Sequence, residues 1–275
     1  MMHFKLNNGV KMPMLGLGVS QIAPDTDGIG VVLAALEAGY RAFDTAEFYG
    51  NEDMVGEGIR QSGIAREEIF VTTKVHNEAQ RAENGAFEAF ERSLKNLGLD
   101  YIDLYLIHWP VPGRYIQTYK ALEKIYKSGR ARAIGVCNCK IHHLQELEKI
   151  WEIPAAVNQY EHHPFLTQKE ILEYCQKKEI LVTAYCPQGR GRLGLHENPV
   201  ITALAAKYNK TPAQIILRWN MDIGVSAIPK TVNHARLKEN IDIFDFQLTD
   251  DDITAINALN TGTRVIRDPD DLTGY

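Results

Sequence analysis

Residues 97–110 read LGLDYIDLYLIHWP, and this stretch predicts a short strand that lies between the end of a helix and a polar side chain. Gly98 follows an amphipathic pattern, at the position where a left-handed residue commonly ends a helix. The run 102–107 is short and apolar, as expected of a strand in a parallel sheet. His108 follows directly. The stretch therefore predicts a helix–strand unit with a titratable side chain at the carboxyl end of its strand.

The same unit recurs along the chain. Short apolar runs alternate with longer amphipathic patterns, which is typical of βαβ units and a parallel sheet. The expected strands are 14–18, 41–44, 69–73, 102–107, 131–136, 156–159, 180–185 and 225–228. The expected helices are 28–37, 51–62, 85–96, 115–127, 141–151, 168–178, 212–220 and 233–239. Eight consecutive units favour an α/β fold of the closed (β/α)₈ TIM-barrel type.

Further elements are expected at both ends of the chain. The segment 6–10, LNNGV, has an Asn-Gly step that predicts an N-terminal β-hairpin before the first barrel strand. The pattern 251–259 predicts an extra C-terminal helix, followed by a polar tail ending at Tyr275. We expect residues 1–275 to form one domain. A doubly wound dinucleotide-binding sheet is the alternative, but it requires GxGxxG after the first strand, where the sequence reads LGLGVS.

Composition narrows the class of protein. The chain has 275 residues, 45% hydrophobic and 24% charged, with a net charge of −5, and this mild charge indicates neither a nucleic-acid partner nor binding to an anionic membrane surface. No run approaches the roughly 18–20 apolar residues of a membrane helix, and the N-terminus lacks a signal-peptide pattern. The four cysteines form no CxxC pair, so we expect free thiols in a cytoplasmic protein. No metal site is expected, including at the adjacent His162 and His163, which lack suitably spaced partners.

Polar side chains follow three consecutive expected strands, where a barrel of this kind forms its active site. Asp44 ends the second strand, Lys74 follows the third and His108 follows the fourth. Each residue alone has an ordinary explanation. Asp44 could cap a helix, Lys74 could be solvated at the rim or form a Schiff base as in barrel aldolases, and His108 could be a core histidine. Tyr49 alone could be a loop aromatic that packs on the barrel.

Together these four side chains complete one another. Asp44 can supply the counter-charge that a buried Lys74 needs. A lysine cation beside Tyr49 favours the phenolate and is expected to lower the pKa of the phenol from about 10, which makes Tyr49 a candidate proton donor. A neutral His108 could donate a hydrogen bond to a substrate carbonyl. No side chain can supply a hydride, so a nicotinamide cofactor is implied.

Stretches spread through nearly the whole chain resemble the aldo-keto reductase superfamily. They are RAFDTAEFYGNEDMVGEGIR (41–60), VTTK (71–74), LGLDYIDLYLIHWP (97–110), RARAIGVCN (130–138), VNQYEHHP (157–164) and IPKTVNHARLKENIDIF (228–244). The short loop from His108 to Tyr119 and the compact tail are most similar to bacterial and protozoan members of the 2,5-diketo-gluconate reductase and prostaglandin F synthase type. The resemblance implies a (β/α)₈ barrel that reduces aldehydes and ketones reversibly with NADPH.

The resemblance also implies a role for each matching residue. The catalytic tetrad corresponds to Tyr49, Lys74, Asp44 and His108, with Tyr49 as the general acid. The nicotinamide is implied to be held by Asn138 and Gln159 through its carboxamide and by Tyr185, which stacks on its ring. The adenosine 2′-phosphate and the adenine are implied to be held by Lys230, Thr231, Arg236 and Asn240. A lysine and an arginine close together suit a phosphate dianion, which favours NADP(H) over NAD(H).

Departures from the family pattern cluster where substrate would lie. Ser20 stands where Trp or Phe is frequent, and His76 stands where Trp is common. The pocket, with Trp109 as a further aromatic, is therefore expected to be wider and more polar on that side. Cys137 stands where a serine often helps to bind the carboxamide, and sulfur is a weaker hydrogen-bond partner.

Two other functions stay open at this point. The chain could be a catalytically weak NADPH-binding barrel that acts as a redox-sensing or structural protein. It could also be a cofactor-independent lyase that uses Lys74 as a Schiff-base nucleophile. Members of the family are often monomers, so we expect a monomer that acts on a small-molecule carbonyl substrate. The sequence does not identify that substrate, because the pocket loops decide it.

Overall fold

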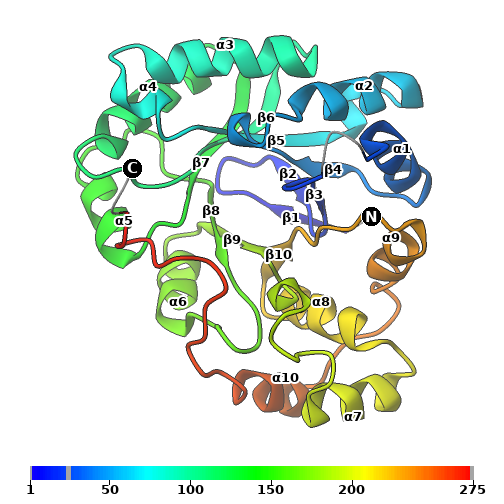
Figure 1. The fold of residues 1–275 in the computed structure, drawn as a ribbon. Helices are drawn as coiled ribbons and strands as arrows, with labels where there is room; N and C mark the ends of the chain where they lie inside the picture. Colours follow the sequence, from blue (N-terminus) through cyan, green and yellow to red (C-terminus); the bar gives the residue numbers. More distant parts are fainter. Residues whose placement is uncertain (1, 23–25, 273–275) are drawn as a thin grey trace.

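The computed structural model describes residues 2–22 and 26–272, so the end of the predicted tail lies outside the described residues. Eight parallel strands form one sheet in the order β10-β9-β8-β7-β6-β5-β4-β3 (Figure 1). The strands are β3 (Leu17–Gly18), β4 (Ala42–Asp44), β5 (Phe70–Val75), β6 (Ile102–Ile107), β7 (Ala131–Cys137), β8 (Val157–Glu161), β9 (Leu181–Tyr185) and β10 (Val225–Ala227). Neighbouring strands in the sheet are also consecutive in the chain. Each crossover runs outside the sheet and brings the chain back beside the strand just completed.

Hydrogen bonds between the first and last strands close this sheet into a barrel. Leu15 and Ala227 form a parallel bridge. The Ala227 nitrogen donates to the Met14 carbonyl at 3.1 Å, and the Gly16 nitrogen donates to the Ala227 carbonyl at 2.9 Å. The Gly18 nitrogen continues the ladder to the Pro229 carbonyl at 3.2 Å. The predicted closed (β/α)₈ barrel is confirmed, and closure leaves this sheet without an exposed edge.

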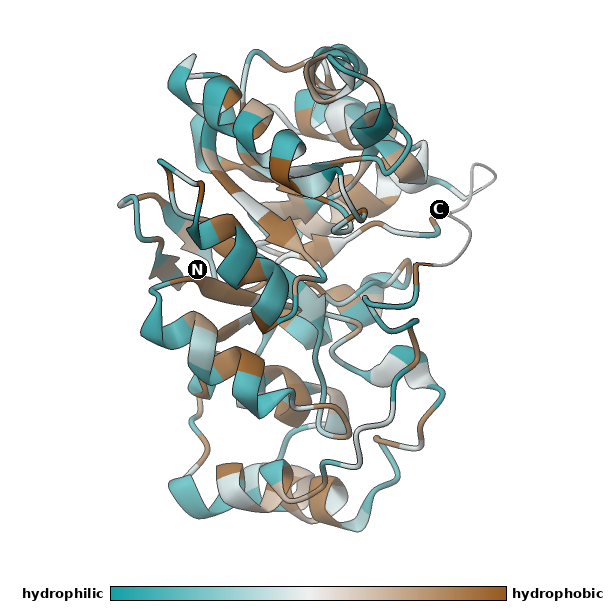
Figure 2. Ribbon diagram, turned by 90° about the vertical axis from the view of Figure 1, so that its left-hand side faces the viewer, coloured by the Kyte–Doolittle hydropathy of each residue, from teal (hydrophilic) through white to brown (hydrophobic). Residues whose placement is uncertain are grey.

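Helices surround the barrel, and their striped hydropathy is visible in Figure 2. They are α1 (Gly28–Glu37), α2 (Glu52–Ser62), α3 (Gly85–Leu97), α4 (Tyr115–Lys127), α5 (Ile141–Glu148), α6 (Lys169–Lys177), α7 (Pro199–Tyr208), α8 (Pro212–Asp222), α9 (His234–Ile241) and α10 (Asp250–Asn257). Short 3₁₀ turns are η1 (Glu47–Tyr49), η2 (Arg66–Glu68), η3 (Ala79–Arg81) and η4 (Gly189–Gly191).

One helix was missed by the sequence prediction. A single helix, 212–220, was expected after the seventh strand, but α7 precedes it. The signal was available, because Asn198 caps α7 by accepting from the Val200 nitrogen, and Pro199 occupies the first turn. Thr211 caps α8, where Gln214 completes a capping box. The predicted C-terminal helix is α10.

The N-terminal hairpin covers the amino end of the barrel. Its strands β1 (His3–Lys5) and β2 (Lys11–Pro13) pair antiparallel, as the Asn-Gly step predicts, and Gly9 has a φ of +87° in the turn. The side chains of Asn7 and Asn8 each donate at 2.9 Å to carbonyls near the amino ends of β8 and β7. Leu6 and Met12 pack in one cluster with residues of the barrel strands. The amino end is thereby closed, and the carboxyl ends of the strands remain for the site.

His162 is a buried histidine in the wall between β8 and α8. Its ring stacks on Trp219, with centroids 4.9 Å apart and planes inclined by 11°. Its Nδ1 lies 2.9 Å from the Asn220 Oδ1. Burial lowers the pKa of His162 from 6.5 to about 4. Its role is therefore that of a neutral packing group.

We expect the free energy of unfolding to fall as the pH is lowered from 6.5 to 4. In that window the unfolded chain protonates His162 while the folded protein does not, which costs up to about 3 kcal/mol. Urea unfolding at pH 7, 6 and 5 measures this loss. His162→Phe keeps the stacked ring but cannot titrate, so its stability should fall less over the same range. An equal loss in both proteins would assign the pH dependence to other groups.

Candidate active site

The four predicted catalytic side chains meet at the carboxyl ends of β4, β5 and β6. The Lys74 ammonium donates to Asp44 Oδ1 at 2.5 Å and to the Thr45 carbonyl at 2.7 Å. Lys74 Nζ lies 5.1 Å from the centroid of the Tyr49 ring. The Tyr49 and His108 rings contact edge to face, with centroids 5.6 Å apart. Residues separated along the chain thus form one cluster.

The loop that carries Tyr49 is held by side chains on both sides of it. Asn51 accepts from the Thr45 hydroxyl and donates to the Val19 carbonyl, both at 2.9 Å. Glu47 accepts from the Arg92 guanidinium at 2.7 Å and from the His76 nitrogen at 3.3 Å. These contacts tie η1 to the strands on either side of it, so Tyr49 sits on a fixed turn rather than on a loose loop.

Lys74 is fully buried and carries its charge in the fold. Burial opposes that charge, but the neighbouring Asp44 carboxylate raises the pKa of the Lys74 ammonium above its usual range. Asp44 also accepts from the Gln159 amide at 2.7 Å, so both of its oxygens are hydrogen-bonded. A charged, buried amine is no nucleophile, which argues against the Schiff-base alternative. Lys74 is therefore not a solvated residue at the rim of the barrel. Asp44 is not a helix cap, because both of its oxygens accept hydrogen bonds from the side chains of Lys74 and Gln159.

Burial sets the protonation of the other two members. Burial raises the pKa of Tyr49 above its ordinary value, although the Lys74 cation lowers it. The lowered Tyr49 pKa predicted from the sequence is therefore wrong in its net direction, because burial outweighs the lysine. Burial, and then the Lys74 charge, hold the pKa of His108 well below its ordinary value. At neutral pH the cluster thus holds a protonated phenol and a neutral imidazole.

Three of the four side chains in the cluster face a cavity of about 1260 Å³ at the carboxyl end of the barrel. Its lining includes Asp44, Tyr49 and His108, and the same cavity continues to Lys230, which precedes α9, and to Arg236 in the first turn of α9. One continuous space therefore joins the catalytic candidates to the predicted phosphate-binding residues.

The predicted nicotinamide residues line this cavity and are hydrogen-bonded to the cluster. Asn138 donates to the His108 carbonyl at 3.0 Å and accepts from the Tyr185 hydroxyl at 2.6 Å. Gln159 donates to Asp44, and its Oε1 lies 3.8 Å from the Cys137 sulfur. Each amide nitrogen carries a second hydrogen, which can serve a bound carboxamide. Tyr185 is thus oriented by Asn138.

All four predicted adenosine-binding residues also line the cavity. Thr231 and Asn240 are buried, whereas Lys230 and Arg236 are exposed. Two cations at a helix N-terminus form a suitable site for a phosphate dianion. With the amides at the inner end, the donor set of this cavity fits NADP(H).

The three predicted pocket residues do not lie alike. Ser20 and Trp109 line the cavity directly. His76 instead stacks on Phe48, with ring centroids 4.9 Å apart and planes inclined by 13°. Phe48 lines the cavity and is 59% exposed. His76 therefore shapes the pocket through Phe48.

Sequence reasoning missed a group of cationic lining residues. They are Arg190, Arg192 and Arg267. The first two lie in and beside η4, directly after β9, where the chain reads Gly189-Arg190-Gly191-Arg192. Alternating glycine and arginine beyond a strand end was a usable signal, because such a loop offers backbone donors and charge to an anion.

The fold and the site define a barrel oxidoreductase with a nicotinamide-binding cavity. The chain matches the model of the aldo/keto reductase family over residues 14–261, and it belongs to that family. It is 51% identical over 268 residues to glyoxal reductase of Bacillus subtilis (strain 168), covering 98% of this chain and 96% of that protein. Relatives of this similarity share the reaction class, so the chain is an enzyme that reduces carbonyl compounds with NADPH.

Solved structures agree with the family. An aldo-keto reductase from a Medee basin deep-sea metagenome library has a TM-score of 0.95 and 43% identity, covering 98% of this chain and 99% of that one. A Bombyx mori aldo-keto reductase in complex with NADP has a TM-score of 0.91 and 39% identity, covering 98% and 96%. No helix among the described residues is long and apolar enough to cross a membrane.

Asp44→Asn is expected to destabilise the protein by about 3–5 kcal/mol, because it leaves the buried Lys74 cation without its carboxylate. Urea unfolding at pH 7 measures the loss. The double variant Asp44→Asn with Lys74→Met removes both charges and should recover part of it. A single variant as stable as the wild type would contradict the buried ion pair.

Proposed function

We propose that Tyr49 is the general acid of carbonyl reduction, with Lys74, Asp44 and His108 as its catalytic partners. The observation that supports this assignment is that a protonated phenol and a neutral imidazole meet on the cavity wall, with a buried lysine cation beside the phenol ring. These are the groups needed to give up a proton, to stabilise the phenolate left behind and to orient a carbonyl.

In this proposal NADPH, when bound, supplies the hydride. The neutral His108 imidazole and the Tyr49 hydroxyl hold the substrate oxygen between them. As negative charge develops on that oxygen, Tyr49 donates its proton. Lys74 then stabilises the phenolate electrostatically, and Asp44 keeps the lysine charged and in place. Donors fixed around the developing charge supply much of the rate, because they need no reorganisation.

The same proposal assigns the cofactor contacts. Asn138 and Gln159 bind the carboxamide through their remaining amide hydrogens, and Tyr185 stacks on the nicotinamide ring. Lys230 and Arg236 pair with the 2′-phosphate. Thr231 and Asn240 contact the adenosine, and the fact that all four residues line the same cavity supports these contacts.

We further propose that short, polar aldehydes with an adjacent carbonyl are good substrates. The relative at 51% identity is named for glyoxal reduction. In this chain Ser20 lines the cavity and His76 backs Phe48, where bulkier apolar walls are frequent in the family. Comparing glyoxal with an aromatic aldehyde under NADPH tests this preference. A higher kcat/KM for the aromatic aldehyde would contradict it.

The remaining assignments concern the state of the protein. We propose one domain over residues 1–275 and a cytoplasmic monomer, which acts on small molecules and not on nucleic acid. Support for the cytoplasmic location comes from the four cysteines, which all fall within the described residues and are free thiols. Three of them are buried, as packed thiols in a reducing compartment would be.

Tyr49→Phe is expected to fold and to bind NADPH, but its kcat should be lower by a factor of at least about 10²–10³. Proton donation is lost while the ring is retained. Steady-state absorbance at 340 nm measures turnover, and quenching of protein fluorescence measures NADPH binding. Wild-type turnover in this variant would exclude Tyr49 as the proton donor. Loss of NADPH binding would show instead that the phenol supports the cofactor.

Arg236→Ala should raise the KM for NADPH by about tenfold and leave the KM for NADH within about twofold, because only NADPH has the 2′-phosphate that the guanidinium pairs with. Initial rates with each cofactor give both values. Lys238→Ala on the same helix is the control, since Lys238 is exposed and does not line the cavity, and neither KM should change. An equal increase in the KM values for NADPH and NADH would show that Arg236 does not pair with the 2′-phosphate.

A further inference from the structure

The C-terminal tail crosses the carboxyl end of the barrel and forms part of the cavity wall. Figure 1 shows the chain running from α10 past α6 towards α5. On this path Val265, Ile266 and Arg267 line the cavity. The described residues of the tail after α10, 258–272, form no helix or strand, so other groups must hold their backbone in place.

Glu161, the last residue of β8, holds the tail by its backbone. The Val265 nitrogen donates to Glu161 Oε1 at 2.7 Å, and the Ile266 nitrogen donates to Oε2 at 2.9 Å. Its side chain is 0% exposed, and its Oε1 also lies 3.0 Å from His163 Nε2. Both carboxylate oxygens are therefore used to fix adjacent residues of the tail, in a buried setting where hydrogen bonds to a charged acceptor are strong.

The position of Glu161 tells which part of the cavity the tail borders. Glu161 follows Gln159 by two residues in β8, so the two side chains point to the same side of the strand, with Glu161 nearer the carboxyl end. Glu161 also pairs in register with Tyr185 of β9. Gln159 and Tyr185 are the residues proposed to hold the nicotinamide. The tail therefore passes beside the place where a carbonyl substrate must meet that ring.

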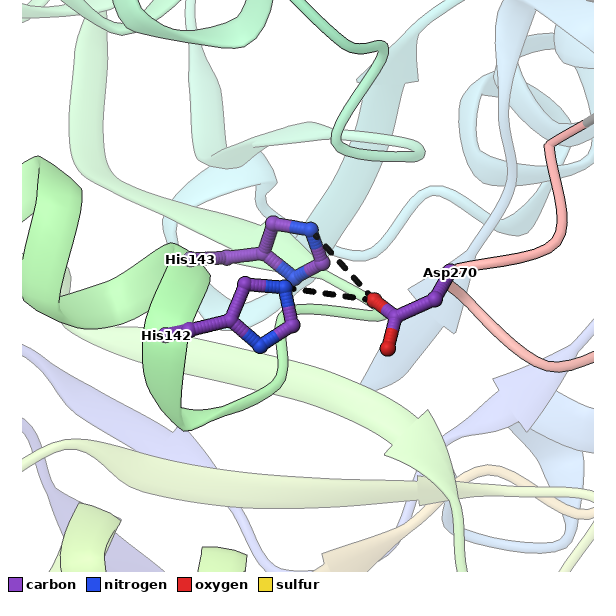
Figure 3. Close-up of side chains that lie close together, drawn as sticks. All are labelled: His142, His143 and Asp270. Atoms are coloured by element: carbon purple, nitrogen blue, oxygen red, sulfur yellow. Dashed lines mark ion pairs between the residues drawn. The ribbon is translucent and has the colours of Figure 1, made fainter.

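A second set of contacts fastens the tail farther out, at α5. Lys140 pairs with Asp268 at 2.5 Å and with Asp270 at 2.7 Å. Figure 3 shows His142 and His143 both facing Asp270, with His142 Nε2 at 3.2 Å from its Oδ1. Half of the His142 and Asp270 side chains is exposed, and such surface pairs contribute little to stability.

His142, His143 and Asp270 are residue types that bind metals, but the protonation state of His143 does not suit a metal ligand. His143 Nδ1 accepts a hydrogen bond from the Lys140 nitrogen, so the proton of the neutral ring is on Nε2, the atom that faces Asp270. The Lys140 ammonium also occupies the other oxygen of Asp270. These residues are therefore better described as ion pairs that hold the tail against α5 than as ligands for a cation.

We propose that Glu161 is a positioning residue for substrate binding, which acts by fixing residues 265 and 266 as a wall of the substrate part of the cavity. The proposal rests on the proposed function, carbonyl reduction at Tyr49. Glu161 does not touch the reacting oxygen or the proton donor. Its loss should therefore weaken substrate binding while the chemical step and the cofactor contacts persist.

Glu161→Gln is the decisive variant, because its amide nitrogen must face a backbone N–H where a carboxylate oxygen accepted one. We expect the KM for 4-nitrobenzaldehyde, a substrate large enough to reach the tail, to rise about tenfold. The kcat and the dissociation constant of NADPH should each stay within about twofold. A fall in kcat with KM unchanged would overturn the proposal, since that pattern belongs to a residue acting on the transition state.

Asp103→Asn is the matched control. Asp103 is equally buried and accepts the Val71 nitrogen at 2.9 Å, and it also pairs with Arg66 and Arg132. It lies near the start of β6, at the amino end of the barrel, away from the cavity. Its loss should lower the free energy of unfolding without changing any KM. An increase in KM equal to that of Glu161→Gln would attribute the effect to general destabilisation and overturn the proposal.

Limited trypsin digestion tests the anchor without any substrate. Cleavage after Arg264 or Arg267 requires the tail to leave the barrel, so Glu161→Gln should speed the appearance of the shortened chain about tenfold. Mass spectrometry identifies the product. An unchanged rate would overturn the anchor even if KM rises. If the wild type reduces no carbonyl at all, the proposed function fails, but this digestion still decides whether Glu161 holds the tail.

Val265→Pro tests the same contact from the tail, because proline removes the N–H that donates to Glu161 Oε1. It also serves if Glu161→Gln does not fold. We expect a similar increase in KM and in trypsin cleavage. In the double variant the increase should be smaller than the product of the two single effects, since both remove one contact. Fully multiplicative effects would show that Glu161 acts by another route.

Discussion

The buried ion pair between Lys74 and Asp44 is the contact on which the rest of the site depends. It places a positive charge at the centre of a closed barrel, where an unpaired charge would be very costly. The same carboxylate binds Gln159 from β8, so one group joins β4, β5 and the opposite part of the barrel. The charge then acts on its neighbours, because it opposes ionisation of His108 and favours ionisation of Tyr49. Burial alone would keep both rings neutral, and in the proposed mechanism the lysine is what makes the phenolate an accessible product of proton donation.

Much of this arrangement could be predicted from the sequence. The alternation of apolar runs and amphipathic patterns is a local property, and so are caps such as Thr211-Pro212 and the Asn8-Gly9 turn. The cluster of four candidate side chains could be located because the carboxyl ends of parallel strands share one face of the barrel. The direction of the Tyr49 pKa shift could not, since the sum of burial and a nearby charge depends on how deeply the ring is packed. His76 shows the same limit, because its contact with Phe48 depends on side-chain orientation and not on strand order.

The two ends of the barrel are treated differently by the chain. At the amino end a hairpin covers the strands, bonded by Asn7 and Asn8 to carbonyls of β8 and β7. At the carboxyl end the cover is a tail that is held by backbone contacts to one buried carboxylate and by exposed ion pairs. The first cover closes off a packed core, and the second borders a cavity. The described residues of the second cover, 258–272, form no helix or strand and depend on contacts such as those with Glu161 for their position.

Chemistry and selectivity are therefore carried by parts of different rigidity. Asp44 and Lys74 lie in strands, His108 directly follows one, and the short turn of Tyr49 is pinned by Asn51 and Glu47. The tail at 265–267, which is proposed to border the substrate, lies outside the helices and strands, where changes of sequence are tolerated more easily. Glu161 connects the two, since it is a strand residue whose hydrogen bonds are made to the tail. A tail of different sequence could still bind there, because Glu161 recognises backbone N–H groups, which every residue except proline provides. The fold can thus keep one reaction while the shape of its substrate wall varies.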